Sequence, residues 1–346
     1  MSATLLGFGS LVLILLTAFG QESEESLNIE KFSPELDSLI SRSAKLEKLA
    51  SGFKWTEGPV WISSGYLLFA EIPSNSIRKW SPKAGASIFL QPSGYKGSAA
   101  YGGPEPGSNG MTLDPHGRLT VAGHAERNVW RLESMNPDGQ ITVLVDSYQG
   151  KKLNSPNDLV YKKDGSLYFT DPPYGLRTQS ENDPEKQLSM SGVYRLPGAA
   201  NIQAGAKPDN PRLELLTSEL PRPNGIAFSP DEKTLYVNNS EPKKIWMRYD
   251  VQPDGSVKNG ALFFDASSDK RAGAPDGMKV DREGNIYSTG PGGIWVFSSQ
   301  GKHLGTVDIP EKAGNLAWGD ADWKSLYITA SSSVYRIRMN AVGMKP

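Results

Sequence analysis

Cysteine is absent from the 346 residues of the chain, and histidine is scarce, with three residues. The lack of thiols excludes disulfides, thiolate nucleophiles and thiolate metal sites, so any metal ligand must be an oxygen atom or an imidazole nitrogen. The chain also lacks a G-x-S-x-G sequence, and His116, His124 and His303 offer little from which to build a serine nucleophile with its histidine base. Chemistry that depends on an activated serine or cysteine is therefore not indicated.

Charge of one sign is not concentrated anywhere in the chain. Its 37 basic and 38 acidic residues give a formal net charge of -1. A nucleic-acid partner would show as a basic face, and a membrane-surface role as a basic amphipathic helix. We expect neither; a small, nearly neutral molecule is the better-matched partner, and the sequence leaves the oligomeric state open.

Long apolar runs are missing except near the N-terminus, between Leu5 and Phe19. This run carries no charge and is shorter than the roughly 20 residues that a membrane-spanning helix needs. Ala18 and Gly20 place small residues where a signal peptidase would read before Gln21. We predict a cleaved signal peptide over residues 1–20 and export to the periplasm or the outside of the cell, with no stable membrane insertion afterwards. An uncleaved anchor is the alternative, because no Lys or Arg precedes the run. Residues 21–45 should form a polar leader strapped to the domain.

What the chain has instead is a repeated unit. A polar residue, an apolar strand, a turn with Asp, Gly or Pro, and a second apolar strand recur six times, each copy followed by a third strand. The copies begin at the lead residues Glu57, Asn109, Asn157, Asn224, Asp276 and Asn315. With 36 Gly and 25 Pro, the chain is interrupted too often for long helices. One four-stranded blade per copy predicts an all-β fold, a six-bladed β-propeller over residues 46–340; a β-sandwich of regular hairpins is the alternative.

Closing such a ring requires a strand from the other end of the domain, because radial folds protect their edges. We expect the segment from Leu46 to Phe53 to complete the last blade. In the sixth copy Asn315 stands one residue closer to its apolar strand than the other lead residues do, so its orientation can differ from theirs.

The lead residues predict a metal site on the propeller axis. The innermost strand of each blade lines the central channel, so residues at its start meet their counterparts from other blades. Two carboxylates and four amides would converge without a basic side chain among them, and buried charges need partners. Calcium accepts six to eight such oxygen ligands in irregular geometry, whereas zinc would call for His or Cys. Turn formation is the simpler explanation for any single Asn-Gly or Asp-Gly pair, but the recurrence in register and the odd Glu57 favour one divalent cation, with calcium preferred.

The motifs TEGPVW at Glu57, SPNDLV at Asn157, FTDPPYGL ending at Leu176, RPNGIAFS at Asn224 and APDGMKVD at Asp276 carry a resemblance. Over Leu46 to Met339 the chain resembles the family of senescence marker protein (regucalcin), gluconolactonase and related lactonases, and is most similar to the bacterial gluconolactonases. The resemblance implies a six-bladed propeller with one catalytic divalent cation. Its ligands would fall on Glu57, Asn157, Asn224 and Asp276. Asn157 is also a candidate for substrate contact, and Asn109 would face the substrate or support the ligands.

Three further residues are candidates for lining a substrate pocket. His124 ends the second strand of its blade near the expected channel mouth, where the related lactonases often carry His-Gly; in this chain His-Ala follows. Tyr174 stands in the rigid Asp171-Pro-Pro-Tyr loop, and Arg222 precedes Pro223-Asn224. Each has a structural alternative, as a loop histidine, a packing tyrosine or a surface arginine.

Together these features predict a metal-dependent hydrolase that opens a sugar lactone with a metal-activated water. Asp276, with a second oxygen free, is the expected general base, and Glu57 the metal anchor. One alternative keeps the site but acts on a phosphotriester or aryl ester. Another is a non-catalytic propeller that binds carbohydrate or protein and contains a structural calcium.

Overall fold

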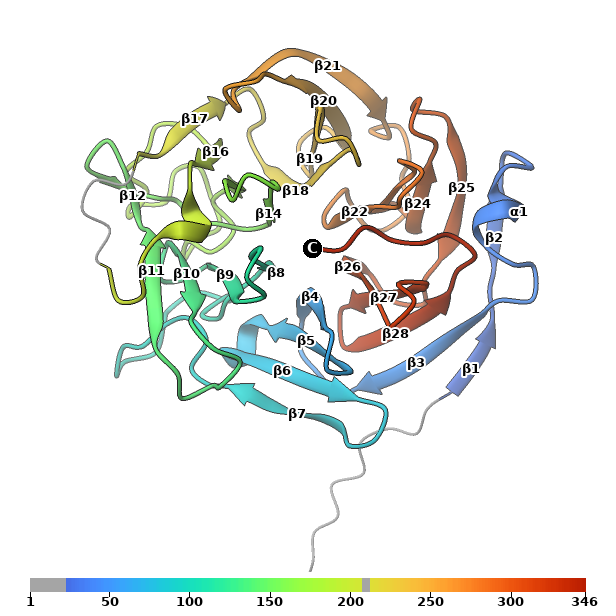
Figure 1. Ribbon diagram of the computed structural model, residues 1–346, viewed down its shortest axis with the longest axis horizontal. Helices are drawn as coiled ribbons and strands as arrows, with labels where there is room; N and C mark the ends of the chain where they lie inside the picture. Colours follow the sequence, from blue (N-terminus) through green and yellow to red (C-terminus); the bar gives the residue numbers. More distant parts are fainter. Residues whose placement is uncertain (1–22, 207–211) are drawn as a thin grey trace, which may run out of the picture.

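The computed structural model describes residues 23–206 and 212–346, and its main sheets form a ring of six antiparallel blades (Figure 1). Within each blade the strands follow one another from the centre of the ring outward. This arrangement is the six-bladed β-propeller predicted from the repeat. The predicted signal peptide, residues 1–20, lies outside the described residues.

Each blade has four main strands, ordered from the innermost outward. Blade 1 has β4 (Thr56–Ile62), β5 (Tyr66–Glu71), β6 (Ser76–Ser81) and β7 (Gly85–Leu90), and blade 2 has β8 (Met111–Leu113), β9 (Leu119–Gly123), β10 (Asn128–Leu132) and β11 (Ile141–Val145). Blade 3 has β14 (Leu159–Tyr161), β15 (Leu167–Asp171), β16 (Gly192–Leu196) and β17 (Glu214–Thr217), and blade 4 has β18 (Pro223–Phe228), β19 (Thr234–Asn239), β20 (Ile245–Val251) and β21 (Val257–Asp265). Blade 5 has β22 (Met278–Val280), β23 (Ile286–Gly290), β24 (Gly293–Phe297) and β25 (His303–Asp308), and blade 6 has β26 (Ala313–Gly319), β27 (Ser325–Ala330), β28 (Ser333–Arg338) and β3 (Lys45–Ser51). A hairpin of β12 (Ser147–Tyr148) and β13 (Lys151–Lys152) and two short 3-10 helices, η1 (Ile72–Ser74) and η2 (Ala199–Asn201), occupy the connections.

The ring is closed by the strand that precedes Glu57. In β3, Leu46 pairs with Ile337 and Ala50 with Val334 of β28, so the start of the domain supplies the outer strand of blade 6. This confirms the prediction for that segment. Because β3 is joined to β4 by only a few residues, the first and last blades are held together by one continuous stretch of chain.

The leader extends the last two blades outward. β1 (Ser23–Ser26) pairs with β3, and β2 (Ile29–Lys31) pairs with β25, which makes both blades five-stranded. Between β2 and β3, the one-turn helix α1 (Leu36–Leu39) buries Leu36 and Leu39. The described part of the leader is therefore attached by strand pairing and by apolar packing.

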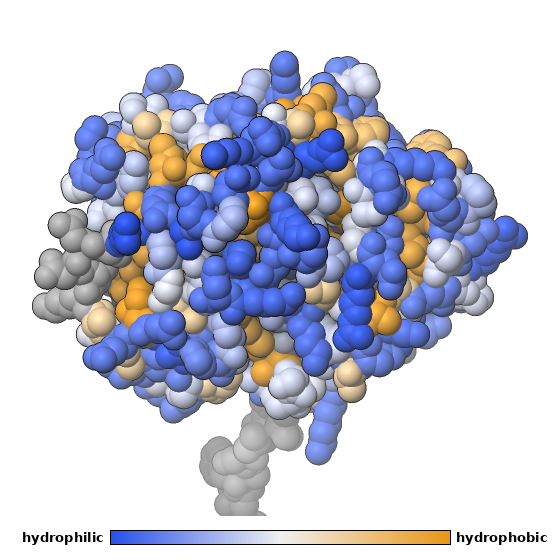
Figure 2. Space-filling view, turned by 45° about the horizontal axis from the view of Figure 1, so that its top comes forward, coloured by the Kyte–Doolittle hydropathy of each residue, from blue (hydrophilic) through white to orange (hydrophobic). Residues whose placement is uncertain are grey.

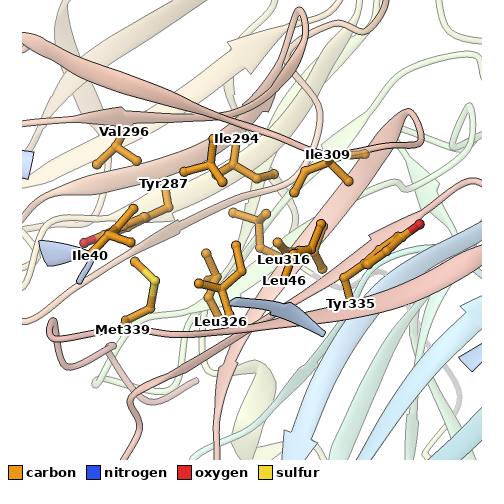
Figure 3. Close-up of a cluster of buried hydrophobic side chains, with 14 of the residues drawn as sticks. Ile40, Leu46, Tyr287, Ile294, Val296, Ile309, Leu316, Leu326, Tyr335 and Met339 are labelled. Carbon is orange, nitrogen blue, oxygen red and sulfur yellow. The ribbon is translucent and has the colours of Figure 1, made fainter. Parts of the chain in front are cut away.

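The core is a series of apolar layers between neighbouring blades. Figure 3 shows one of them, in which Ile40 and Leu46 lie with Tyr287 of blade 5 and Leu326 and Tyr335 of blade 6. Both faces of a blade are covered, so strands such as β9, β15, β23 and β27 are buried along their whole length rather than on alternate residues. Burial of one such leucine stabilises the fold by roughly 1.5–3 kcal/mol.

Polar side chains dominate the face shown in Figure 2, with apolar residues in small patches between them. Phe32, Ile88 and Leu262 are the exposed large apolar side chains of the described chain. Within residues 23–206 and 212–346, no helix is long and apolar enough to cross a bilayer.

Candidate active site

The lead residues lie where neighbouring inner strands approach each other at one end of the channel. A methyl group added to Gly58 would lie 2.1 Å from the carbonyl oxygen of Asn109, and one added to Gly225 would lie 2.1 Å from that of Asp276. Where blade 6 meets blade 1, a methyl group added to Gly314 would lie 2.2 Å from Oε1 of Glu57. Glycine beside a lead residue is therefore a requirement of close backbone approach, and each contact joins one lead residue to the next blade.

Hydrogen bonds complete this ring of contacts. Gly110 donates its N–H to the carbonyl oxygen of Asn157 at 2.8 Å, and the hydroxyl of Thr170 donates to that of Asn224 at 2.7 Å. Glu57, Asn109, Asn157, Asn224 and Asp276 thus start adjacent inner strands around one centre. Of these, Asp276 is partly exposed, and the other four are buried.

The sixth blade departs from the pattern. Gly277 donates to the carbonyl oxygen of Gly314 at 2.8 Å, as Gly110 does to Asn157, so Gly314 occupies the lead position and Asn315 the position after it. The Asn315 Oδ1 atom accepts the N–H of Leu316 at 2.8 Å. The one-residue offset seen in the sequence is therefore real, and Asn315 sits one level deeper in the channel than the other lead residues.

Blade 3 places an aspartate where four other blades have glycine. Asp158 follows Asn157 and turns its Oδ1 onto the N–H of Leu159 at 2.9 Å, in the same manner as Asn315. Its carboxylate is buried, and the ammonium of Lys279 lies 3.9 Å from Oδ2. Burial raises the pKa of Asp158 against the opposing charge of Lys279. Sequence reasoning overlooked this residue, although its signal was the missing glycine in the third repeat.

The pKa values of both lead carboxylates, Glu57 and Asp276, are raised. Burial raises the pKa of Glu57 to about 8, against a hydrogen bond from the Gly58 N–H, and the negative charge of Asp158 adds to the rise. The pKa of Asp276 is raised by its removal from water and then by the charge of Glu57, while Lys312 opposes the shift. The charge of Glu57 acts on Asp276, which indicates that the two side chains lie close together at this end of the channel. Neither carboxylate forms an ion pair within 4.0 Å among the described residues, and Lys312 acts on Asp276 from farther away.

The amides add acceptor oxygens to the same end. The side-chain nitrogen of Asn224 donates to the hydroxyl of Ser240 at 3.1 Å, which leaves Oδ1 as the free end of the amide. Within the described residues, Oδ1 of Asn224 and Oδ1 of Asn109 are buried without a hydrogen-bond partner. Buried acceptors without donors cost free energy. The residues present therefore fit a hard cation, which is bound by carboxylate and amide oxygens.

The lead residues offer only oxygen donors. No group of three or more His, Asp or Glu side chains at metal-binding distance occurs in the part of the chain that the structure describes. A cation here would rely on two carboxylates, amide oxygens and water, a combination that suits calcium or magnesium better than zinc.

His124 lies behind the site with a partner that sequence reasoning missed. Its ring is fully buried, and Nδ1 is 3.0 Å from Oε2 of Glu105. The second oxygen of Glu105 accepts a hydrogen bond from Gln179 at 2.9 Å. The charge of Glu105 contributes to the raised pKa of both lead carboxylates, so it faces the same centre. Glu105 stands in the loop between β7 and β8 and belongs to no repeat or motif, so no pattern pointed to it.

Tyr174 and Arg222 form a second group at the active-site end of the channel. The guanidinium of Arg222 lies 5.0 Å from the ring centroid of Tyr174 and donates to the carbonyl oxygen of Gln179 at 3.2 Å. Burial raises the pKa of Tyr174 to about 12, and the charge of Asp276 adds to the rise. The phenol therefore remains neutral and stands near Asp276, able to donate or accept a hydrogen bond.

Lys312 also lies near the active-site end of the channel, and the sequence analysis did not predict it. Its ammonium lies 5.1 Å from the ring centroid of Trp55, and its charge lowers the pKa of Asp276 against the effect of burial. Both residues stand in short connections outside the repeated unit.

A model of the SMP-30/Gluconolactonase/LRE-like region matches residues 55–332. The chain belongs to this family. Among characterised relatives, the gluconolactonase of Zymomonas mobilis is 40% identical over 95% of this chain and 92% of its own length. Regucalcin of Xenopus laevis is 24% identical over 84% of this chain and 87% of its own length. A solved gluconolactonase structure from Xanthomonas campestris superimposes with a TM-score of 0.77 at 29% identity, covering 94% of this chain and 99% of that one.

The family match includes every lead residue and all six inner strands. It excludes β1, β2 and β3, which precede residue 55, and β28 with the C-terminal residues that follow it. The similarity therefore covers the channel and the candidate site.

Proposed function

We propose that this family member hydrolyses a sugar lactone, with one divalent cation, preferentially calcium, held by Glu57, Asn157, Asn224 and Asp276. The observation that carries the proposal is that two carboxylates of raised pKa share one end of the channel with amide oxygens that have no hydrogen-bond partner among the described residues. The relatives named gluconolactonase support the choice of reaction. When bound, such a cation polarises the lactone carbonyl and acidifies a water molecule.

Asp276 is the general base in this proposal. Of the lead side chains it is the partly exposed one, so a water molecule and a substrate can reach it. Its raised pKa brings the carboxylate closer to neutral pH, where a base can both be ionised and accept a proton from water. Glu57, buried below it, would anchor the site, because a bound cation would hold this carboxylate in its ionised form.

The remaining groups of the mouth orient the substrate. A sugar lactone carries several hydroxyls, and Tyr174, Glu105 and the amides of Asn109 and Asn157 offer acceptors and donors at suitable depth. Arg222, stacked on Tyr174, holds that ring in place and presents N–H groups to the mouth. His124 supports Glu105 from behind.

The test is to measure the metal content of the purified protein and the hydrolysis of glucono-1,5-lactone before chelation, after EDTA treatment and after re-addition of calcium. Activity should be lost with EDTA and return with calcium. Asp276→Asn should lower turnover by about 10²–10⁴-fold, whereas Asp231→Asn, an exposed carboxylate in a turn, should leave it unchanged. Full activity in EDTA would refute the metal role, and faster hydrolysis of a phosphotriester or aryl ester than of the lactone would refute the substrate.

We further propose that residues 1–20 direct export and are removed before Gln21. The uncharged apolar run and its small residues support this. N-terminal sequencing of the protein recovered from the periplasm or medium of an expressing bacterium should begin at Gln21. Retention of Met1 on protein in the cytoplasm would refute it.

A further inference from the structure

A cavity, called the lower cavity below, lies at the other end of the channel from the candidate active site. It has a volume of about 510 Å³ and is lined by residues that follow the lead positions in all six inner strands. These include Trp61, Met111, Tyr161, Phe228, Val280 and Trp318. A volume in this range accommodates one small organic molecule. Because Trp61 lies four residues beyond Glu57 on β4, the cavity and the lead residues occupy different levels of the channel.

The C-terminal tail borders this lower cavity. Met344 donates its N–H to the carbonyl oxygen of Val280 at 3.1 Å, and Gly343 donates to that of Trp323 at 2.8 Å. These bonds hold the tail across the inner strands, so the last residues, Met344 to Pro346, line the cavity and lie near the centre of the ring (Figure 1). The tail thus forms part of the wall and partly covers the opening.

The walls of the lower cavity are aromatic, and basic side chains also line it. Trp61, Tyr161, Phe228 and Trp318 supply flat apolar surfaces. The basic side chains that also line the cavity are Lys162, Lys163, Lys279, Arg282 and Lys345. Glu232 is the one acidic side chain among the lining residues of the described chain.

Carboxylates neutralise only part of this charge: Lys162 pairs with Glu232, and Lys279 with Asp158. The Oε1 atom of Glu232 accepts the backbone N–H of Lys163 at 2.8 Å, and its Oε2 atom lies 3.6 Å from the Lys162 ammonium.

Arg282 and Lys345 are exposed, and neither forms an ion pair within 4.0 Å among the described residues. The Lys345 ammonium lies 5.6 Å from the ring centroid of Trp323, so it must turn from this ring to meet a ligand in the cavity. The uncompensated charge therefore complements an anion whose body fits the aromatic walls.

We propose that the lower cavity binds an aromatic organic anion, of the aryl carboxylate class, with its ring between the inner strands and its carboxylate at Arg282 and Lys345. Aromatic rings pack on Trp, Tyr and Phe with a geometric preference beyond burial alone. Guanidinium and ammonium groups at the mouth supply charge-assisted hydrogen bonds to a carboxylate. This site is separate from the proposed lactonase centre and does not depend on it.

The test is calorimetric titration of the purified protein with 2-naphthoate and with 2-naphthalenemethanol, its neutral counterpart, at low and at high ionic strength. Naphthoate should bind about tenfold more tightly than the alcohol at low ionic strength, and salt should remove most of that difference. Equal affinity for both would refute anion recognition, and the absence of naphthoate binding would refute the site.

Variants locate the binding. Arg282→Gln combined with Lys345→Gln should weaken naphthoate by about tenfold, while Lys258→Gln, an exposed lysine on the outer strand β21, should have no effect. Val160→Trp, which adds volume to the cavity wall, should abolish binding of both probes if its melting temperature stays near that of the wild type. Asp276→Asn should leave naphthoate binding intact. If Asp276→Asn lost naphthoate binding while the variants of the lower cavity kept it, the ligand would bind at the candidate active site. That result would overturn the proposal.

Discussion

In the cation-free protein, replacing Glu57 with glutamine is expected to raise the free energy of unfolding at alkaline pH, although it should remove activity. Glu57 is only 2% exposed, and burial is the main cause that raises its pKa from 4.5 to about 8. A carboxylic acid whose pKa is higher in the folded than in the unfolded chain stabilises the fold while it is protonated. That contribution is present below pH 4.5 and is lost as the pH rises toward 8, because the unfolded chain then releases a proton that the native protein still holds.

The size of the effect follows from the shift. The difference between 4.5 and about 8 corresponds to roughly 5 kcal/mol for an isolated group. The charge of Glu57 also raises the pKa of Asp276. Part of the gain in unfolding free energy will therefore come from a lower Asp276 pKa once residue 57 is neutral. Water entering the channel lowers the total, and we expect a gain on the order of 2–5 kcal/mol at pH 9 and little change at pH 4. Glutamine retains a carbonyl oxygen for the Gly58 N–H, which Glu57 accepts at 3.2 Å.

The assay is urea denaturation in EDTA across pH 4 to 9, repeated in calcium. Wild type should lose stability with rising pH in EDTA and regain it with calcium, by about 2.7 kcal/mol when the ion is at 100 times its dissociation constant. Glu57→Gln should lose less, because at this end of the channel only Asp276 and Asp158 then keep a raised pKa, and it should respond less to calcium. Glu311→Gln is the matched control. Burial raises the Glu311 pKa less than the hydrogen bonds that it accepts lower it, among them those from Ser332 and Tyr335 at 2.8 and 2.7 Å. Its neutralisation should therefore destabilise the protein at neutral and alkaline pH. Destabilisation by Glu57→Gln at pH 9 in EDTA would refute the reasoning.

Three further outcomes are expected. Glu105→Gln removes a negative charge that raises the pKa of Asp276, so the acid limb of the pH profile of kcat/KM should move to lower pH; an upward shift would contradict this. Gly225→Ala places a methyl group 2.1 Å from the Asp276 carbonyl oxygen and should cost about 1–3 kcal/mol or more in urea denaturation, together with calcium affinity; unchanged calcium binding would show that the close approach does not position Asp276. Arg222→Gln should raise KM for the lactone several-fold with little change in kcat, because the guanidinium stacks on Tyr174 at 5.0 Å and its ion-pair partner is Glu241, at 3.7 Å; an equal loss in kcat would contradict that interpretation.

The repeat made the fold predictable because each copy carries its own strand signals. The lead residue, the turn and the paired apolar strands are local features, and six of them in series leave few architectures other than a propeller. The closing strand β3 was predictable for a physical reason, since an open ring would leave an unpaired edge. The attachment of β2 to β25 was not, because a three-residue strand of Ile-Glu-Lys has no distinctive pattern.

The candidate site was predictable only where it belongs to the repeat. Glu57, Asn157, Asn224 and Asp276 were found by their register, and the structure brings them to one channel end, which leaves their roles as a proposal. Glu105 and Lys312 come from connecting loops, whose paths depend on packing between blades and not on local sequence. Asp158 was visible as an aspartate in a glycine position, but its burial beside Lys279 required the fold.

The seam of the ring explains why Glu57 can be held so near to its neighbours. Its carboxylate faces Gly314 of blade 6, the blade whose outer strand β3 ends at Ser51, just before Glu57 in the chain. The same short connection therefore fixes both the edge of blade 6 and the start of blade 1. Thr56 reinforces it by donating its hydroxyl to the Ser333 carbonyl oxygen of β28 at 3.1 Å. Because closure of the ring and placement of Glu57 depend on the same contacts, the stability of the fold offsets the cost of burying this carboxylate.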